Sequence, residues 1–416
     1  MELKNNSVIH FFSIYIEKFN GLEEEYIVGR KDTGEYINVP SVAVESIELL
    51  KSGMDIETVE KELSTKYNEE IGVYEFIKTC IEIGFIKKVD GREILHEEPK
   101  SPVTDQFSFI KQSFAKILFN PFSWVIYTAL SIYSLCLFYV SPNSLPHIRD
   151  FLFHDSLSVV VTVGLLSMWG LIFIHEMGHL IAARAHGTES KVKFGRSGMY
   201  LVIETVIPNV WSVSRKGRNE IFLAGLAFNS VMLSLSLTFV TIHDLGILTM
   251  SEELYRFLRF VNIINVWSFI TQPLIFTKSD LYYVLNNQWN CTDLHGNTAL
   301  FTRQKFGFQI SDEDRQKLEK ISSHERIGIN KYVPIYFIGL IFSACVAVAY
   351  VGFTFWYLKA SMDTFTQFEL TTLVFWDHFF GLGYLITPII WLFVYLIQDF
   401  FKAKQRASFV TRSDQV

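Results

Sequence analysis

Two histidines and a glutamate lie together in the chain as His175-Glu176-Met177-Gly178-His179, the pattern H-E-x-x-H. Residues four apart share one face of a helix, so His175 and His179 can offer two imidazoles to one metal ion. Glu176 follows the first histidine, where a carboxylate can take a proton from a water on that metal. The spacing therefore predicts a hydrolytic site that binds Zn²⁺. The alternative is a pair of histidines that form hydrogen bonds between helices.

The setting of the motif supports a chemical role. It lies inside a long apolar run, residues 156–185. An ionisable group in the middle of a bilayer costs about 2.5–3.5 kcal/mol. Three such groups close together in one apolar run therefore indicate a function.

A third metal ligand must come from elsewhere, because a hydrolytic zinc ion usually has three protein ligands and an open position for water. Asp280 is the candidate, since it follows a later apolar run that is expected to end on the same side of the membrane. Pro273 breaks the helix before it and frees backbone groups near the carboxylate. An aspartate at a helix end can also be a solvated cap. The next candidates are then Asn262, Asn265 and His295.

The composition is that of a membrane protein with a soluble part. The 416 residues are 50% hydrophobic, with a mean hydropathy of +0.24, which is too apolar for an ordinary soluble protein. The net charge of −6 argues against a nucleic-acid partner. Six apolar runs are long enough to span a bilayer: 122–140, 158–183, 220–242, 254–276, 333–358 and 375–401.

Lysine and arginine set the expected orientation of these spans. They cluster after the second, fourth and last runs, and the opposite loops hold few of them. Arg256 and Arg259 are the one contrary pair. We therefore expect a multi-pass protein of the cell membrane with both termini in the cytoplasm. His175 and His179 then lie in the cytoplasmic third of the second span.

A compact soluble module is expected before the first span. Residues 25–28 and 36–39 have the pattern of two strands joined by a turn at residues 32–34. Three helices follow, and Ser41 and Asp55 are expected to cap the first two.

The third helix is expected over residues 71–83, where Gly84 ends it before a closing strand, 85–89. This order is typical of a small winged-helix domain. The predicted fold class is therefore mainly α: about six transmembrane helices and a small cytoplasmic α+β winged-helix domain at the N-terminus. The expected domains are this module at 1–100, a linker at 101–120, the membrane core with the zinc site at 121–302, a cytoplasmic loop at 303–332, and a C-terminal pair of transmembrane helices with a tail at 333–416.

Two further motifs accompany the histidines. A-G-x-x-x-N occupies residues 224–229, and Pro273 precedes Asp280-Leu281-Tyr282-Tyr283. Together with H-E-x-x-H, these motifs resemble the site-2-protease-type intramembrane zinc metallopeptidases, in their bacterial peptide-maturation branch. The resemblance covers roughly residues 156–300. It implies that Asp280 is the third zinc ligand and that Asn229 lies near the bound substrate.

The chain departs from that family pattern at three positions. Gln272 stands where the family often has Asn, Leu226 where many members have Pro, and Leu281 where it usually has Gly. The usual glycine lets the backbone turn at the ligand. Leu281 is therefore the one residue that favours a decayed site.

The N-terminal module, with the stretches LLKSGMDIETVEKELSTKY and FIKTCIEIGFIKK, resembles the PqqD-like peptide-recognition domains. The resemblance implies that the module binds the leader of a ribosomally made precursor peptide. The leader is expected to add as a strand along the edge of the hairpin formed by residues 25–39. Many acidic residues argue against DNA as the partner. The alternative is a structural cap without a ligand.

A second hairpin is expected beside the zinc site, at residues 191–194 and 199–206, around Gly195 to Gly198. A membrane helix hides its peptide bonds, so a substrate must unwind before it is cut. An edge of this hairpin, with Tyr200 and Val202, can hold the unwound segment as an added strand. The alternative is a juxtamembrane anchor.

The sequence thus predicts an intramembrane zinc endopeptidase, with Glu176 as its catalytic base, that cleaves a ribosomally synthesised precursor peptide during maturation or export. Expected partners are that peptide, membrane lipid, and a peptide-modifying enzyme or exporter. Two alternatives stay open. One is regulatory cleavage of a membrane-anchored regulator, and the other is a zinc-bound immunity or export component without catalysis.

Overall fold

The computed structural model describes residues 3–20, 24–94, 106–197, 200–319, 321–367 and 370–413. The chain forms two compact units. The first comprises Met1–Lys116, Ala183–Lys191 and Val206–Arg218. The second comprises Ile117–Ala182, Val192–Thr205 and Asn219–Val416.

Two small antiparallel sheets form the β part of the first unit. One sheet has the order β2-β3-β4, and these strands are Tyr15–Asn20, Glu24–Arg30 and Glu35–Pro40. The other has the order β1-β5-β6, and these strands are Ile9–Phe11, Ile86–Val89 and Arg92–Glu93. The expected strands at 25–28, 36–39 and 85–89 are confirmed, and the sequence pattern missed β2. Because β3 is central, the edges of its sheet are β2 and β4.

Three helices pack with these strands: α1 (Ser41–Lys51), α2 (Ile56–Tyr67) and α3 (Val73–Glu82). Each contributes a fully buried aliphatic side chain to one apolar core, which contains Ile47, Val59 and Ile77. The three helices are those that the sequence predicts. The winged-helix class of the module stays a prediction.

The two predicted helix caps differ in outcome. Asp55 caps α2, because its side chain accepts a hydrogen bond from the backbone N–H of Thr58. The predicted cap by Ser41 is wrong. Pro40 is the residue before the helix, no side chain caps it, and Ser41 is already the first helical residue. The φ of −70° at Pro40 lets β4 run directly into α1, since proline is pre-set for a helix start.

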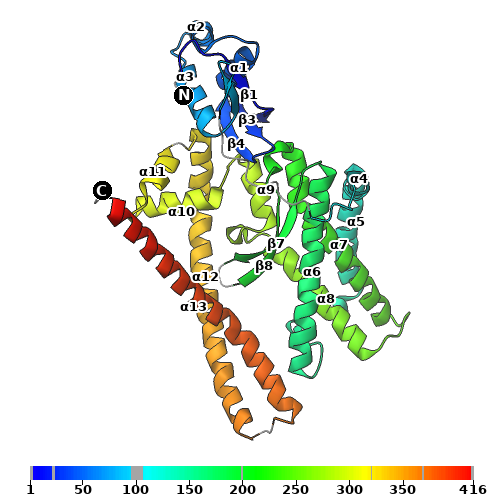
Figure 1. Ribbon diagram of the computed structural model, residues 1–416. Coiled ribbons are helices and arrows are strands. Elements are labelled where there is room, and N and C mark those ends of the chain that lie inside the picture. The colour runs from blue at the N-terminus through cyan, green and yellow to red at the C-terminus, as the bar shows by residue number, and fades with distance from the viewer. Residues whose placement is uncertain are drawn as a thin grey trace. The chain divides into compact units, whose positions relative to one another are not determined.

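Five helices in the described part of the chain are long and apolar enough to cross a membrane. They are α5 (Pro121–Val140), α6 (Leu157–Ala185) and α7 (Arg215–Asp244), with Glu325–Met362 of α12 (Ser323–Gln367) and Leu373–Tyr395 of α13 (Leu373–Ser413). These helices support the prediction of a mainly helical membrane protein. In Figure 1, α12 and α13 form a long antiparallel pair.

The sixth expected span, 254–276, forms the helix α8, Glu252–Thr271, which is not among the five. It ends five residues earlier than expected, just before Pro273, and its polar side chains lower its mean hydropathy. Arg259 forms a salt bridge with Asp150 at 2.9 Å. Arg256 pairs with Asp155 at 3.0 Å. Arg259 and Asp150 thus form a largely buried pair, whereas the pair of Arg256 and Asp155 is exposed.

Helix α6, which carries the H-E-x-x-H motif, is fixed to its neighbours at two points. Asp377 of α13 accepts hydrogen bonds at the start of α6 from the Ser158 N–H and from the hydroxyls of Ser156 and Ser158, at 2.6–2.8 Å. Further along, a Cβ on Gly178 would lie 2.6 Å from the Ala224 carbonyl oxygen of α7. The backbones of α6 and α7 thus approach closely beside the motif, as small residues allow.

The remaining helices connect α8 to α12. They are α9 (Asp280–Gln288), α10 (Leu294–Lys305) and α11 (Asp312–Glu319). Tyr282 and Leu294 pack with Tyr332 of α12 in one buried cluster. The stretch expected as a loop, 303–332, therefore contains α11 and the start of α12. Before the first span lies one more helix, α4 (Gln112–Leu118).

Candidate metal centre

His175, His179 and Asp280 bring three donor side chains together in the second unit. The two histidine Nε2 atoms are 3.1 Å apart. Asp280 places Oδ2 at 3.2 Å from His175 Nε2 and Oδ1 at 3.4 Å from His179 Nε2. Tetrahedral zinc with ligands at about 2.0–2.1 Å holds them about 3.3 Å apart. The two imidazole nitrogens and one or both oxygens of the Asp280 carboxylate could therefore share one metal ion.

The turn before α9 carries Asp280 to the histidines. Lys278 adopts the left-handed conformation, with φ at 59°, and the Ser279 hydroxyl donates to the Gln272 carbonyl at 2.7 Å. Leu281 is not among the non-glycine residues with positive φ in the described chain. The left-handed conformation that turns the chain is adopted by Lys278. Position 281, directly after the candidate ligand Asp280, therefore does not require glycine.

Asp280 Oδ2 is a buried acceptor that receives no hydrogen bond within the described residues. Its nearest polar neighbours are the two histidines, and a buried carboxylate is unfavourable unless it is paired with a cation. A metal ion held between this oxygen and the histidines would supply that charge. The burial of this oxygen thus fits a metal ligand better than a solvated cap.

Helix α7 orients His179. The Nδ1 of His179 lies 2.8 Å from the carbonyl oxygen of Ile221. Because a carbonyl can only accept, the proton lies on Nδ1 and the lone pair of Nε2 points toward His175 and Asp280. This is the usual arrangement of a metal-binding histidine.

Gly225 leaves space for both imidazoles. A Cβ at this position would lie 2.4 Å from His175 Nε2 and 2.6 Å from His179 Nε2. Real Cβ contacts are almost never shorter than 3.0 Å. The A-G-x-x-x-N motif therefore has a local steric reason: only glycine at 225 lets α7 pass against the two histidines.

Glu176 is held from the predicted hairpin, which forms as β7 (Lys191–Ser197) and β8 (Tyr200–Val206). The backbone N–H of Thr205 donates to Glu176 Oε2 at 2.8 Å, and the Thr205 hydroxyl donates to the Glu176 carbonyl at 3.0 Å. A donor atom of Glu176 lies within 4.8 Å of one on each histidine. The bond from Thr205 fixes one carboxylate oxygen and leaves the other for proton transfer.

A cavity of about 300 Å³ is lined by His175, Glu176 and Asp280, and His179 is not among its lining residues. Its walls include Asn229, the polar side chains Asn265, Ser268 and Thr271 of α8, and Gln272, which directly follows that helix. Asn229 also donates from Nδ2 to the Ser268 Oγ at 2.7 Å, so it both links α7 to α8 and lines the cavity. Polar residues on a helix packed within a membrane protein are costly and mark functional surfaces.

The other predicted residues have mixed positions. Val202 lies half-buried in β8 and is not among the residues that line the metal cavity. Tyr200 begins β8, but its side chain lies outside the described residues. Of the substitute ligands, Asn265 lines the cavity, and Asn262 accepts a hydrogen bond from Ser236 at 2.5 Å.

His295, the third substitute ligand, lies in an aromatic cluster. Its backbone N–H donates to the Tyr282 hydroxyl at 2.9 Å, and its Nδ1 is 3.3 Å from the Tyr332 hydroxyl. It is not among the residues of the metal cavity. Sequence patterns also missed Thr205 and Ile221, because the bonds to the Glu176 carboxylate and to the His179 ring come from their backbone groups, which no side-chain motif records.

Comparison with known proteins identified no relative. No family model matches the chain, and neither a curated protein nor a solved structure matches it. The chemistry of the candidate centre therefore rests on its own residues. His175, His179 and Asp280 offer donor atoms of the kind that bind metal ions, and the Glu176 carboxylate lies beside them. This arrangement is suited to hydrolysis with an activated water.

Proposed function

We propose that this chain is an intramembrane zinc endopeptidase of the site-2-protease type. The observation that carries the proposal is the approach of three donor side chains. The Nε2 atoms of His175 and His179 are 3.1 Å apart, and each lies within 3.4 Å of an oxygen of the Asp280 carboxylate. Two imidazoles and one carboxylate are a common donor set for catalytic zinc. A bound zinc ion would supply Lewis acidity toward a peptide carbonyl and lower the pKa of water.

The protein's own residues would then do the following. Glu176 accepts the proton of the attacking water through the oxygen that Thr205 leaves available, and delivers it to the leaving amine. The Ile221 carbonyl keeps the proton of His179 on Nδ1, so that Nε2 stays a ligand. Asn229 and the polar side chains of α8 offer hydrogen bonds to a substrate backbone that has lost its helical ones.

An active centre is favoured over a decayed one. The departure at Leu281 does not move the carboxylate away, because both Asp280 oxygens lie within 3.4 Å of a histidine nitrogen. The turn is made at Lys278 instead. A decayed centre would have no need of a glycine at 225 to make room for both imidazoles.

The N-terminal module suggests the substrate. We propose that it is a PqqD-like domain that binds the leader of a ribosomally made precursor peptide, with the protein in the cell membrane and both termini in the cytoplasm. Since β3 is central in its sheet, an added strand can pair only with β2 or β4. Residues 25–28 of the predicted binding hairpin are thus excluded, and residues 36–39 of β4 remain.

Deleting the module would also remove contacts within the first unit. The Tyr36 hydroxyl donates to Asn209 Oδ1 at 3.1 Å, and Asn209 Nδ2 donates to the Lys31 carbonyl at 3.0 Å. Point changes are therefore a cleaner test of leader binding than truncation. Proline placed in β2 or in β4 removes an edge donor. Only the change in the strand that pairs with the leader should raise the KM for a full precursor without altering cleavage of its leaderless core.

The deciding experiment compares Glu176→Gln with Glu189→Gln in purified protein. Glu189 is exposed and lies outside the metal cavity, so it is a matched control. We expect Glu176→Gln to bind zinc normally and to lose about 10²–10⁴-fold in cleavage rate, the usual contribution of a general base. His175→Ala and Asp280→Ala should instead lose zinc, with exposed His10→Ala as their control. A Glu176→Gln protein with the wild-type rate would refute the assignment.

A further inference from the structure

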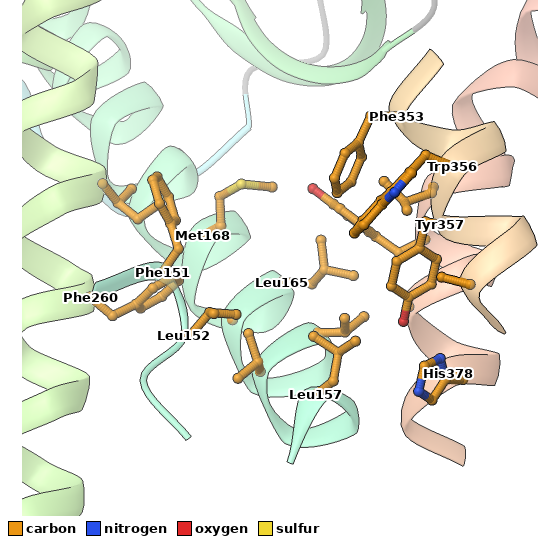
Figure 2. Close-up of a pocket in the computed structure, with 18 residues that line it drawn as sticks. Phe151, Leu152, Leu157, Leu165, Met168, Phe260, Phe353, Trp356, Tyr357 and His378 are labelled. Carbon is orange, nitrogen blue, oxygen red and sulfur yellow. The ribbon is translucent and has the colours of Figure 1, made fainter. Parts of the chain in front are cut away.

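A second cavity lies next to the metal cavity in the same unit. Its volume is about 700 Å³, within the range of about 300–1,000 Å³ that is usual for ligand sites. It is a half-open cavity lined by residues of α6, α8, α12 and α13 and by Phe151 and Leu152 before α6, and almost all of its wall is apolar. Figure 2 shows Leu157 and Leu165 of α6 opposite Trp356 and Tyr357 of α12.

One face of α6 runs from this apolar cavity into the metal cavity. Val161, Leu165 and Met168 line the apolar cavity, and Ile172 and His175 line the metal cavity. Their spacings of four, three, four and three residues place all five on one side of the helix. His175, a candidate zinc ligand, therefore lies on the same face of α6 as the residues of the apolar wall.

Helix α8 makes the same connection. Phe260 lines the apolar cavity, Ser268 lines the metal cavity, and Ile264 between them lines both. These residues follow one another at intervals of four, again on one face. Two helices thus form a common wall for both cavities, and the cavities adjoin end to end.

The walls of the two cavities differ in polarity, as do the unwound backbone and the apolar side chains of a membrane peptide. At the metal, an unwound backbone needs hydrogen-bonding partners, which Asn229, Asn265 and Ser268 offer. Beyond Ile264 the wall is apolar and aromatic, with Phe260, Phe353 and Trp356. Such a wall stabilises apolar side chains and offers little to a polar strand.

We propose that the apolar cavity is a substrate subsite that holds an apolar segment of the peptide on one side of the scissile bond. The proposal rests on the proposed peptidase function and names its substrate class. Met168 lies seven residues from His175, or about 10 Å along the helix. The segment therefore begins about three extended residues from the scissile bond. The cavity wall continues to Leu157, about 16 Å further, which accommodates about five extended residues.

Gly164 and Gly170 of α6 provide a matched pair of variants. Gly164 is buried and lines the apolar cavity, and a Cβ there makes ordinary contacts at 3.5 Å with Phe153 and Phe260. Gly170 is exposed, lines neither cavity, and has nothing within 4 Å of its Cβ position. Gly164→Leu should fill the subsite, and Gly170→Leu should leave it open.

The test measures binding in the inactive Glu176→Gln protein, so that it does not depend on cleavage. The probe is a synthetic peptide with a polar half and a leucine-rich half that carries a photoreactive leucine. A second peptide has serine and glycine in place of the leucine-rich half. Cross-linked residues are mapped by mass spectrometry, and native mass spectrometry records any lipid that stays bound.

We expect the apolar peptide to cross-link to α12 and α13. Gly164→Leu should reduce that yield at least tenfold and Gly170→Leu should not. Trp356→Ser, a change at an exposed part of the wall, should also reduce it if Gly164→Leu does not fold. Equal yields in the Gly164 and Gly170 variants would overturn the proposal. So would a bound lipid that Gly164→Leu expels while peptide cross-linking is unchanged. Wild-type protein that neither binds zinc nor cleaves a peptide, together with intact cross-linking in the Glu176→Gln protein, would contradict the proposed function alone.

Discussion

Gly225→Ala adds a single methyl group at the tightest point of the candidate centre. Its Cβ would lie 2.4 Å from both Cε1 and Nε2 of His175 and 2.6 Å from His179 Nε2. An unstrained contact needs about 3.4 Å. The imidazoles or α7 must therefore move by about 1 Å. Since His179 Nδ1 is also held by Ile221 on α7, moving α7 pulls that ring as well.

A displacement of this size is large for a metal centre. A misplacement of 1 Å can cost about 10²-fold in rate, and zinc–nitrogen bonds are formed only near 2.0–2.1 Å. We therefore expect Gly225→Ala to lower zinc content and to reduce kcat/KM at least 10²-fold. The fold itself should survive, because alanine is favoured over glycine within a helix by about 0.5–1 kcal/mol.

The assay combines zinc content, cleavage rate and thermal unfolding of the purified protein. Gly170→Ala is the control, because it makes the same substitution on α6 at a position open to its surroundings. It should keep the zinc and the rate and raise the unfolding temperature slightly. If Gly225→Ala matched it in zinc content and rate, the close packing of α7 on the two histidines would be refuted.

Two further predictions concern stability. Asp377→Ala removes the acceptor for Ser156 and Ser158 at the start of α6, and we expect a loss of about 0.5–2 kcal/mol, as for other helix caps. Thermal unfolding measures it, with exposed Asp312→Ala as control, and equal unfolding temperatures would contradict it. In the N-terminal module, the hydrogen bond from Arg30 lowers the pKa of Asp32, and the Thr58 backbone N–H lowers the pKa of Asp55. A lowered pKa in the folded state means that the unfolded state binds more protons, so this stability is present above about pH 4 and lost below it. Hydrogen exchange of α2 against pH should show the loss, and Asp55→Asn, which still caps the helix, should weaken the dependence. An unchanged pH profile in that variant would speak against Asp55.

Side-chain patterns were sufficient for much of the architecture. The alternation of apolar residues located β3, β4 and the helices of the module, and the long apolar runs located α5, α6, α7, α12 and α13. The H-E-x-x-H spacing put two imidazoles on one face of α6, where they lie 3.1 Å apart. The expected membrane topology made Asp280 a candidate third ligand, and the family resemblance also implied it. Its position depends on a turn at Lys278 that no periodicity reveals.

The sequence patterns missed hydrogen bonds made by backbone groups and helix boundaries next to proline residues. Thr205 holds Glu176 through its N–H, and Ile221 holds His179 through its carbonyl. Any residue has a backbone carbonyl and any residue except proline has a backbone N–H, so the sequence contains no signal for these two bonds. The cap expected at Ser41 failed because Pro40 set the start of α1 one residue earlier. The extent of α8 was overestimated because the apolar Leu274, Ile275 and Phe276 lie beyond the break at Pro273.

The partners of α8 bear on how the protein is made. Its polar residues pair with segments that precede it in the chain: Arg259 with Asp150, Arg256 with Asp155, and Asn262 with Ser236. An unpaired arginine within a bilayer costs about 2.5–3.5 kcal/mol. Synthesis proceeds from the N-terminus, so each partner has already left the ribosome when α8 emerges. The partners of Arg259 and Asn262 are therefore already synthesised when α8 packs beside α6 and α7, whereas the exposed pair of Arg256 and Asp155 adds little.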